Sequence, residues 1–431
     1  MTLLDELTAR TEEMARATLD LCLVESPSED FGRLAQVAEH TAELGTRLLG
    51  RAPERLTEQD RPTLYWEPAP GGVLLLGHLD TVWPVGTLAR WPKPLRTRTT
   101  LSCPGVFDMK AGVVQGLYAM AALDSPAGCG MLLTTDEEIG SPVSRPLIEK
   151  VAARAGAVLV LEASADGALK TGRKGVSQYV VRVLGRAAHA GLEPEKGMNA
   201  LLELAEQART VASFGSGGLT VTPTLAAAGT TTNTVPAEAH FHVDARAATR
   251  AEQDALHARM AALSPVLPSA SVTVEGGPNR PPMETGQALP LLDVARLAAR
   301  DLGLGDIRAV GVGGASDGNF TAGIGIPTLD GLGAVGAHAH AEGEYAVIAE
   351  MPRRAALVAG LVARLLATAS ARSAHTRTPK ASTPSSPKCP AGRPSSPASS
   401  PACCHLCDVA TIPRPGSRRR RGSRASAYHA P

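Results

Sequence analysis

The chain alternates short, continuous apolar runs with segments in which apolar residues recur at helical spacing. Helical spacing fills most of residues 1–50, and its first segment ends before Pro27. We then expect strands at 71–80, 129–138 and 156–164 and helices at 109–125 and 144–155. Continuous apolar strands that alternate with helices predict an α/β domain with a mostly parallel sheet covered on both faces.

The pattern changes near residue 173. Segment 175–191 alternates apolar and polar residues, as a strand with one solvated face does. Further strands are expected at 219–229, 233–247 and 271–277, with helices at 197–214 and 250–264. This is typical of a small antiparallel α+β domain. We therefore predict an α/β domain formed by residues 1–172 and 284–370, with a smaller α+β domain, residues 173–283, inserted into it.

Residues 371–431 differ in composition from the rest of the chain. They are rich in Pro, Ser and Arg, and their eleven Lys and Arg residues face a single acid, Asp408. Such a segment cannot bury a core and is expected to be disordered. A frameshift or readthrough product is one explanation of its origin. Its Cys/His cluster at 403–407 and four arginines at 418–421 leave open a non-catalytic protein that binds metal or nucleic acid through this tail.

The overall net charge is +1, so the chain without this basic tail is acidic and offers no electrostatic case for binding nucleic acid or an anionic membrane. The acidic, amphipathic N-terminus does not resemble a signal peptide. No run approaches the roughly 18 apolar residues of a transmembrane helix. Seven cysteines without framework spacing indicate reduced thiols. We expect a cytoplasmic protein with no membrane partner.

Polar side chains that suit metal binding follow several of the expected strands. The run "LLLGHLD" ends in His78 and Asp80, which lie on one face of a strand. Carboxylates and histidines also follow the later strands or loops, at Asp108, Asp136, Glu137, Glu138, Glu162, His338 and His340. Because ligands bind beyond the carboxyl ends of parallel strands, these groups should share one edge of the sheet. Clustered carboxylates are costly there unless cations compensate them.

Two divalent metal ions would compensate this cluster of negative charge. His78 would bind one ion and His340 the other, and Asp108 would bridge them. Glu138 and Glu162 would each complete one set of ligands, with Asp80 orienting His78. Glu137, beside a ligand but not itself bound, suits a general base. Taken singly, each residue is also compatible with a satisfied core histidine or a solvated turn acid.

The motifs resemble those of a known family. The stretches "GHLDTV", "GVFDMKAG", "TTDEEIGS", "LVLEAS", "GRAAHAG", "NTVPAEAHFHVDAR", "GGASDGNF" and "GAHAHAEGEY" are similar, in order, to those of the co-catalytic dizinc exopeptidases and deacylases. That family includes glutamate carboxypeptidase, aminoacylase, acetylornithine deacetylase and succinyl-diaminopimelate desuccinylase. The resemblance covers roughly residues 5–370 and is strongest to the glutamate carboxypeptidase branch.

The resemblance implies a catalytic α/β domain and an inserted dimerisation, or lid, domain. It places the five metal ligands, the base Glu137 and the supporting Asp80 on the residues named above. It further implies that His189 reaches the partner subunit's active site in a homodimer and stabilises the oxyanion. It places Arg246, Asn233, Gly314 and Ser316 at the substrate's carboxylate or carbonyl. Zinc is the expected metal, and Mn or Co suits the same ligands.

These observations predict a metal-dependent hydrolase that cleaves the amide or peptide bond of small carboxylate-bearing substrates. A glutamate-carboxypeptidase-like enzyme is the first reading, and an N-acyl amino acid deacylase is the alternative. The branch's lysine for the γ-carboxylate has no obvious counterpart, which leaves glutamate specificity open. Two further alternatives stay open: His338 instead of His340 as ligand, and Arg173 with Lys174 as readers of an acidic substrate group or as a solvated hinge.

Overall fold

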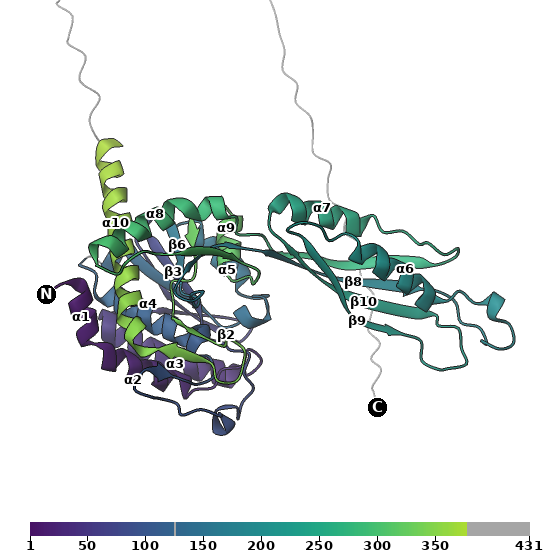
Figure 1. Ribbon diagram of the computed structural model, residues 1–431, viewed down its shortest axis with the longest axis horizontal. Coiled ribbons are helices and arrows are strands. Elements are labelled where there is room, and N and C mark those ends of the chain that lie inside the picture. Colours follow the sequence, from purple (N-terminus) through teal and green to yellow (C-terminus); the bar gives the residue numbers. More distant parts are fainter. Residues whose placement is uncertain (125, 377–431) are drawn as a thin grey trace, which may run out of the picture. The chain divides into compact units, whose positions relative to one another are not determined.

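A computed structural model describes residues 1–124 and 126–376 (Figure 1). The helices are α1 Leu3–Ala9, α2 Thr11–Cys22, α3 Phe31–Leu49, α4 Ala111–Ala121, α5 Arg145–Ala152, α6 Ala200–Ala212, α7 Arg250–Ala261, α8 Thr285–Asp301, α9 Gly318–Gly323 and α10 Met351–Thr376. The strands are β1 Glu54–Glu58, β2 Arg61–Trp66, β3 Val73–His78, β4 Thr100–Leu101, β5 Cys129–Thr134, β6 Ala157–Val160, β7 Leu169–Arg173, β8 Gly175–Leu184, β9 Thr220–Ala228, β10 Glu238–Ala247, β11 Ser271–Arg280, β12 Ala309–Val312, β13 Thr328–Leu329, β14 Gly336–Ala337 and β15 Tyr345–Val347.

The main sheet has six strands in the order β1-β2-β5-β3-β6-β13. Strands β5, β3, β6 and β13 run parallel, whereas β2 and β1 extend the sheet in the antiparallel sense. The mostly parallel α/β sheet is therefore confirmed. The β1–β2 hairpin at one edge was not expected. Its outer strand, "ERLTE", is largely exposed, and an exposed edge strand carries no apolar run to mark it.

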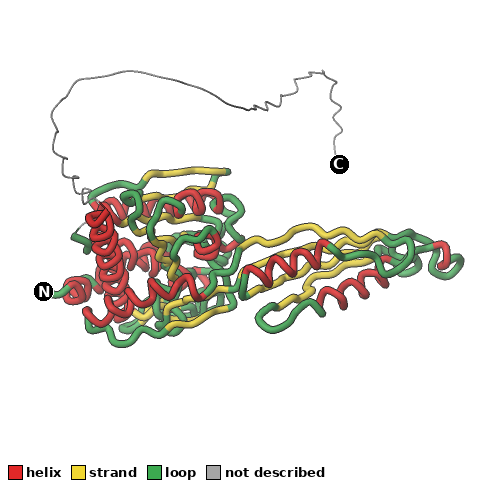
Figure 2. The backbone as a smooth tube through the Cα atoms, turned by 90° about the horizontal axis from the view of Figure 1, so that it is seen from above, coloured by secondary structure: helices red, strands yellow, loops and turns green. Residues whose placement is uncertain are grey.

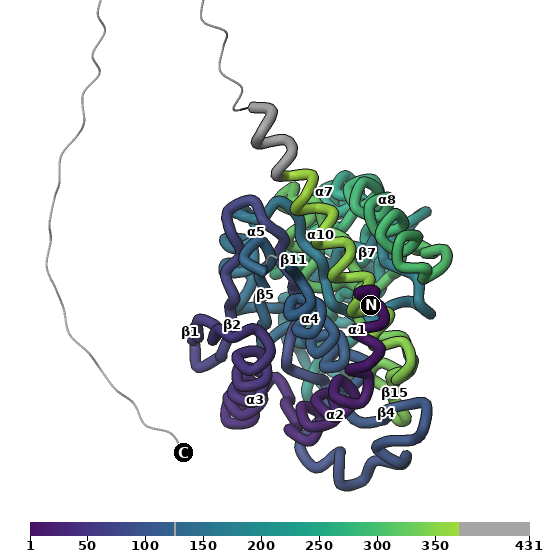
Figure 3. The backbone as a smooth tube through the Cα atoms, turned by 90° about the vertical axis from the view of Figure 1, so that its left-hand side faces the viewer, coloured from purple at the N-terminus to yellow at the C-terminus, as the bar shows by residue number. Residues whose placement is uncertain are grey.

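Helices cover both faces of this sheet because β3 is buried on both. Val73 and Leu75 belong to the larger core, which α1–α4, α8 and α10 complete, and Leu74 and Leu76 belong to a core shared with α5 and α9. Helices α1, α2, α4 and α10 pack against one another (Figure 3). Such two-sided burial explains the uninterrupted apolar sequence of the strand.

Residues between β7 and α8 form a second sheet, of four antiparallel strands in the order β11-β8-β10-β9. Helices α6 and α7 pack on one face of it, where Tyr179, Val181 and Phe241 are buried, and they run alongside its long strands (Figure 2). The smaller α+β unit inserted into the α/β fold is thus confirmed. Arg173 and Met283 exchange two backbone hydrogen bonds of 3.0 Å where the chain enters and leaves this region.

The register of the parallel strands places the candidate residues. His78 ends β3 and pairs with Thr134, which ends β5, while Leu76 pairs with Val160 at the end of β6. The segments that follow β3, β5 and β6 therefore leave the sheet at one edge.

Helix α10 continues through Thr376, so residues 371–376, the first six of the expected tail, are helical. The Cys/His cluster and the arginine run lie outside the described residues. Among the described helices, none has the length and apolar character needed to cross a membrane.

Candidate dinuclear metal site and active site

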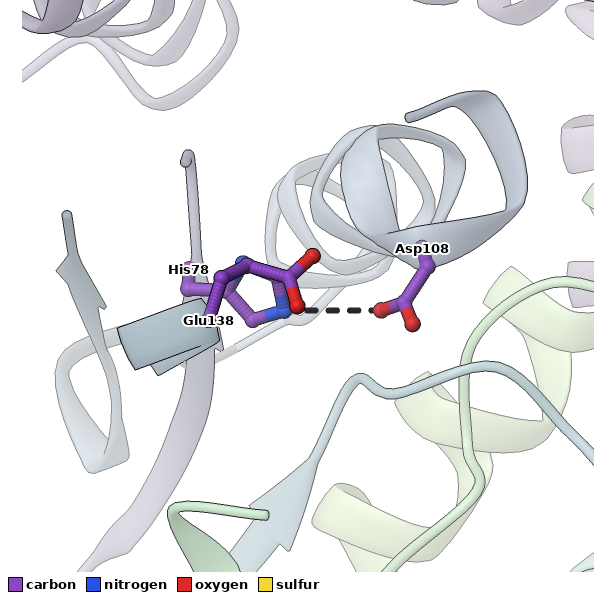
Figure 4. A group of neighbouring side chains, drawn as sticks. All are labelled: His78, Asp108 and Glu138. Atoms are coloured by element: carbon purple, nitrogen blue, oxygen red, sulfur yellow. Dashed lines mark ion pairs between the residues drawn. The ribbon is translucent and has the colours of Figure 1, made fainter. Parts of the chain in front are cut away.

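His78 lies at the end of β3 with its imidazole turned toward two carboxylates. Its Nε2 atom is 3.5 Å from Asp108 Oδ1 (Figure 4). The same atom is 3.5 Å from Glu162 Oε1. The imidazole is buried. His78, Glu162 and Asp108 therefore converge as one nitrogen and two oxygen donors, which is a donor set that suits a divalent transition metal.

His340 approaches the same carboxylate from the other side. Its Nε2 atom is 3.2 Å from Asp108 Oδ2 and 3.1 Å from Glu138 Oε2. Each oxygen of Asp108 thus faces a different histidine, which is the arrangement that a bridging ligand requires. His338 instead packs near the ring of Tyr345, at 6.0 Å between centroids. Of the two histidines, His340 is the one that reaches the cluster.

The residues present fit metal ions. Three buried atoms, His78 Nε2, Asp108 Oδ1 and Glu138 Oε1, have no hydrogen-bond partner among the described residues. Unpaired buried polar atoms are costly, and a cation between them would remove the cost. The carboxylates of Asp108 and then Glu138 raise the pKa of His340 to about 11, which reports the strong negative field at this point. Burial, with a smaller contribution from the nearby carboxylate of Asp108, raises the pKa of Glu138 to about 7.

Asp80 supports His78 from behind. His78 Nδ1 lies 3.0 Å from the backbone oxygen of Asp80 and 3.4 Å from its Oδ1 atom, so Nδ1 carries the proton and Nε2 is left free for a metal. Asp80 also accepts hydrogen bonds from Ser28 Oγ at 2.7 Å and from the backbone N–H groups of Glu137 and Glu138. One buried carboxylate therefore orients both a metal ligand and the segment that bears the candidate base.

Glu137 is held by an arginine that the sequence reasoning missed. Arg280, at the end of β11, forms an ion pair with Glu137 Oε1 and donates to the Glu137 backbone oxygen at 3.0 Å. The same guanidinium contacts Ser141 Oγ at 2.9 Å and Asp317 at 3.2 Å. Burial raises the pKa of Glu137 to about 8, against the opposing effect of Arg280. In the sequence, Arg280 is marked only as a basic residue near the position where the chain returns from the insertion to the α/β domain.

Arg173 is neither a solvated hinge nor a free reader of substrate in this structure. Its guanidinium is buried and forms a two-pronged ion pair with Asp330, at 2.8 and 2.9 Å. It also contacts Glu162 Oε2 at 3.3 Å and donates to the carbonyl of Gly314 at 3.1 Å. Arg173 therefore holds the oxygen of Glu162 that faces away from His78. Its neighbour Lys174 donates to the backbone oxygen of Gly218 at 2.6 Å.

Ser316 lies behind this network. Its hydroxyl donates to Asp330 at 2.6 Å, and its backbone N–H donates to Asn319 at 2.9 Å. Ser316 is buried, and its hydroxyl and its backbone N–H both donate to groups within the protein, so its hydroxyl supports Asp330. Gly314, by contrast, lies in an exposed stretch of the same loop.

The three candidate residues of the inserted region lie apart from the metal-ligand cluster. His189 is exposed, and its Nδ1 atom accepts from the N–H groups of Gly191 and Leu192 at 3.1 Å. Asn233 is exposed, and Arg246 is paired with Asp244 at 2.8 Å. No hydrogen bond or ion pair joins any of the three to the cluster within residues 1–124 and 126–376.

Comparisons with known proteins agree with this geometry. The family described as "Peptidase family M20/M25/M40" matches residues 74–364. Carboxypeptidase G2 of Pseudomonas sp. (strain RS-16) is 32% identical over 307 residues, which cover 67% of this chain and 73% of that protein. Succinyl-diaminopimelate desuccinylase of Dechloromonas aromatica (strain RCB) is 28% identical over 318 residues, 67% of this chain and 82% of that protein.

The solved structures show the same fold. YxeP of Bacillus subtilis, described as a dinuclear metal-binding peptidase from the M20 family, has a TM-score of 0.58 at 15% identity and covers 84% of this chain and 99% of its own. The resemblance read from the motifs is therefore confirmed. The chain belongs to peptidase family M20/M25/M40 and is a metallo-exopeptidase or amidohydrolase of that family.

Proposed function

We propose that this metallohydrolase is a glutamate-carboxypeptidase-like enzyme that removes a C-terminal amino acid from small carboxylate-bearing substrates. The observation that carries the proposal is the position of Asp108 between His78 and His340, with Glu137 buried beside them. The two-ion site comprises His78, Asp108, Glu138, Glu162 and His340. Zinc is the proposed metal, and Mn or Co suits the same donors.

Two divalent ions, when bound, supply Lewis acidity that polarises a carbonyl and acidifies water. The chain supplies the proton transfer: Glu137 takes the proton of the attacking water and delivers it to the leaving nitrogen. Arg280 holds Oε1 of Glu137 and so leaves Oε2 as the oxygen that exchanges the proton. Asp80 keeps His78 in the required tautomer.

The substrate's free carboxylate would be recognised at the edge between the two regions. We assign this role to Arg246, Asn233 and the backbone N–H of Gly314. A guanidinium fork matches a carboxylate, and a glycine backbone permits its close approach. The guanidinium of Arg246 forms an ion pair with Asp244 in this structure, and a substrate carboxylate would take the place of the Asp244 carboxylate.

His189 completes this site only from a second copy of the chain, and we therefore propose a homodimer joined through the inserted sheet. Apolar side chains are exposed on that region, with Leu192 at 76%, Leu225 at 69% and Leu202 at 58% exposure. Exposed apolar residues gathered on one region are typical of a protein interface. We place the enzyme in the cytoplasm, since Cys22, Cys103 and Cys129 are free thiols.

A second activity has a specific observation in its favour. The desuccinylase among the relatives acts on an acyl group rather than a peptide, so an N-acyl amino acid deacylase is the alternative function. The metal site would serve both reactions equally. A panel of dipeptides, acyl-glutamates and N-acetyl amino acids, compared by kcat/KM, separates the two.

The test combines metal content with turnover. The full chain should bind two ions, lose activity with a chelator and regain it on addition of Zn²⁺. Glu137→Gln should keep both ions and lose about 10²–10⁴-fold in kcat, since a general base contributes that much. Glu342→Gln, an exposed acid of the His340 loop, is the matched control and should be unaffected. Full activity of Glu137→Gln would refute the assignment of the base.

A further inference from the structure

Glu344 is a carboxylate that is fully buried, at 0% exposure. No ion pair is formed by its side chain within the described ranges. Instead its Oε1 atom accepts from the backbone N–H groups of Phe107 at 2.7 Å and Asp108 at 3.0 Å. Its Oε2 atom accepts from the N–H of Gly105 at 3.0 Å and from the indole of Trp83 at 2.9 Å. All four of these hydrogen bonds come from N–H donors, and the buried ammonium group of Lys110 also interacts electrostatically with the carboxylate.

Three of these four donors belong to the segment that ends at the bridging Asp108. Each carboxylate oxygen is engaged by this segment, which is therefore held at both ends of Gly105–Asp108. The backbone N–H of Asp108 itself is one of the donors. Hydrogen bonds between N–H groups and a buried carboxylate are strong and directional, so they fix the position from which the Asp108 side chain projects.

Glu344 also lies on the same loop as His340. That loop connects β14 to β15, whose antiparallel pairing brings Gly336 opposite Ala346. Strand β15 pairs in turn with β4, a few residues before Gly105. The backbone oxygen of Glu344 accepts from Ser102 Oγ at 2.8 Å, so backbone and side chain both join the two segments. One residue therefore couples the segment of His340 to the segment of Asp108.

We propose that Glu344 is a positioning residue for the dinuclear site: it holds Asp108 in register with His340 and so sets the affinity for the metal ions. The inference rests on the two-ion assignment proposed above. Glu344 touches neither an ion nor a substrate in this arrangement and acts through Asp108.

The change that tests the proposal is Glu344→Gln. The amide keeps the size of the side chain but has one acceptor oxygen, and its NH₂ group would face backbone N–H donors. Asp108 would then lose its fixed position. Supporting groups of this kind contribute about 10–100-fold to metal affinity, and we expect a loss of that size for at least one ion, measured by competition with a chromogenic chelator for Zn²⁺.

Glu203 provides a matched control elsewhere in the chain. It is also a fully buried glutamate that accepts backbone N–H bonds, from Val266 at 3.0 Å and Leu267 at 2.6 Å, but it lies in α6 of the inserted region. Glu203→Gln should lower the unfolding midpoint of the metal-free chain while leaving Zn²⁺ affinity unchanged. Glu342→Gln removes a charge from the His340 loop without removing these hydrogen bonds and should change neither quantity.

Trp83→Phe keeps the proposal testable if Glu344→Gln does not fold. It removes one of the four donors and retains the aromatic ring that packs edge-to-face on Trp91, at 5.2 Å between centroids. We expect it to weaken Zn²⁺ binding several-fold, in the same direction as Glu344→Gln.

The outcomes are distinct. Weaker Zn²⁺ binding in Glu344→Gln and Trp83→Phe, with normal binding in Glu203→Gln, supports the proposal. Normal Zn²⁺ affinity in both Glu344→Gln and Trp83→Phe, whatever their stability, overturns it. Fewer than two ions in the unmodified chain would instead refute the proposed dinuclear site, and that measurement is independent of every variant.

Discussion

Arg280 donates to both a side-chain oxygen and the backbone oxygen of Glu137, a residue 143 positions away in the chain. Arg280 ends β11, where the inserted region returns to the α/β fold, and Glu137 lies in the segment that follows β5. The inserted region thus reaches the candidate base by a direct contact. The same guanidinium forms an ion pair with the buried carboxylate of Asp317.

Replacing this arginine tests its double role. In Arg280→Met, two buried carboxylates lose their partner, and removal of one member of a buried ion pair costs about 3–5 kcal/mol. We expect the free energy of unfolding, measured by urea titration, to fall by that amount and kcat to fall as well, with two ions retained. Arg280→Lys should recover part of the stability. Unchanged stability in Arg280→Met would show that the pair does not form in solution.

The contact between Asp80 and His78 leads to a prediction about metal binding. Asp80→Ala keeps the backbone oxygen that lies 3.0 Å from His78 Nδ1 but removes the carboxylate oxygen at 3.4 Å, together with the acceptor for the N–H groups of Glu137 and Glu138, so the imidazole is held less firmly with Nε2 toward the metal. We expect Zn²⁺ affinity to fall by about 10–100-fold. Ser28→Ala, which removes one hydrogen bond to Asp80, should have a smaller effect in the same direction. Equal affinities in Asp80→Ala and the unmodified chain would contradict this role.

The pair of Arg173 and Asp330 calls for a double-mutant cycle. Arg173→Met leaves Asp330 buried and unpaired and should cost about 3–5 kcal/mol in unfolding free energy, whereas Arg173→Met combined with Asp330→Leu should recover part of it. Both variants lose the contact with Glu162 and should bind Zn²⁺ more weakly. Strictly additive losses of stability would show that the two side chains do not interact.

We expect Glu203 to make the free energy of unfolding depend on pH in a predictable direction. Burial raises its pKa, but hydrogen bonds from Gln207 and from the N–H groups of Val266 and Leu267 outweigh burial and lower the pKa below 4.5. A lowered pKa stabilises the fold above the unfolded-state pKa and loses that contribution as pH falls through the folded-state pKa. In chelator, the unfolding free energies of the unmodified chain and Glu203→Gln should differ at pH 7 and converge toward pH 3. A difference in unfolding free energy that stays constant between pH 7 and pH 3 would show that titration of Glu203 is not responsible for it.

The residues at the strand ends could be predicted because the apolar run that marks each strand is a local feature of the sequence. The apolar runs before His78, Glu138 and Glu162 mark buried parallel strands, and parallel strands end at a common edge, so clustering of these side chains follows from the sequence. The same logic failed for Arg280 and Glu344. Each is a single polar residue whose partners lie far away in the chain, and nothing near it marks its burial.

The burial of Arg173 likewise could not be predicted from the sequence. A substrate-reading arginine and a solvated hinge have the same local sequence, and only the approach of Asp330, 157 positions later, distinguishes them from the buried ion pair that forms. The exposed edge strand β1 escaped prediction for the opposite reason, since it buries too little to leave a pattern.

Two backbone hydrogen bonds between Arg173 and Met283 close the insertion at its base, so the chain leaves the α/β fold and returns to it at the same place. Its entrance and exit are fixed to each other, so residues can be gained or lost between them without displacing any strand that carries a metal ligand. The positions at its base, such as Lys174, Asn279 and Arg280, contact the α/β fold and must keep their places there. The insertion is therefore a part of the chain whose length can vary while the strands that carry the metal ligands keep their places.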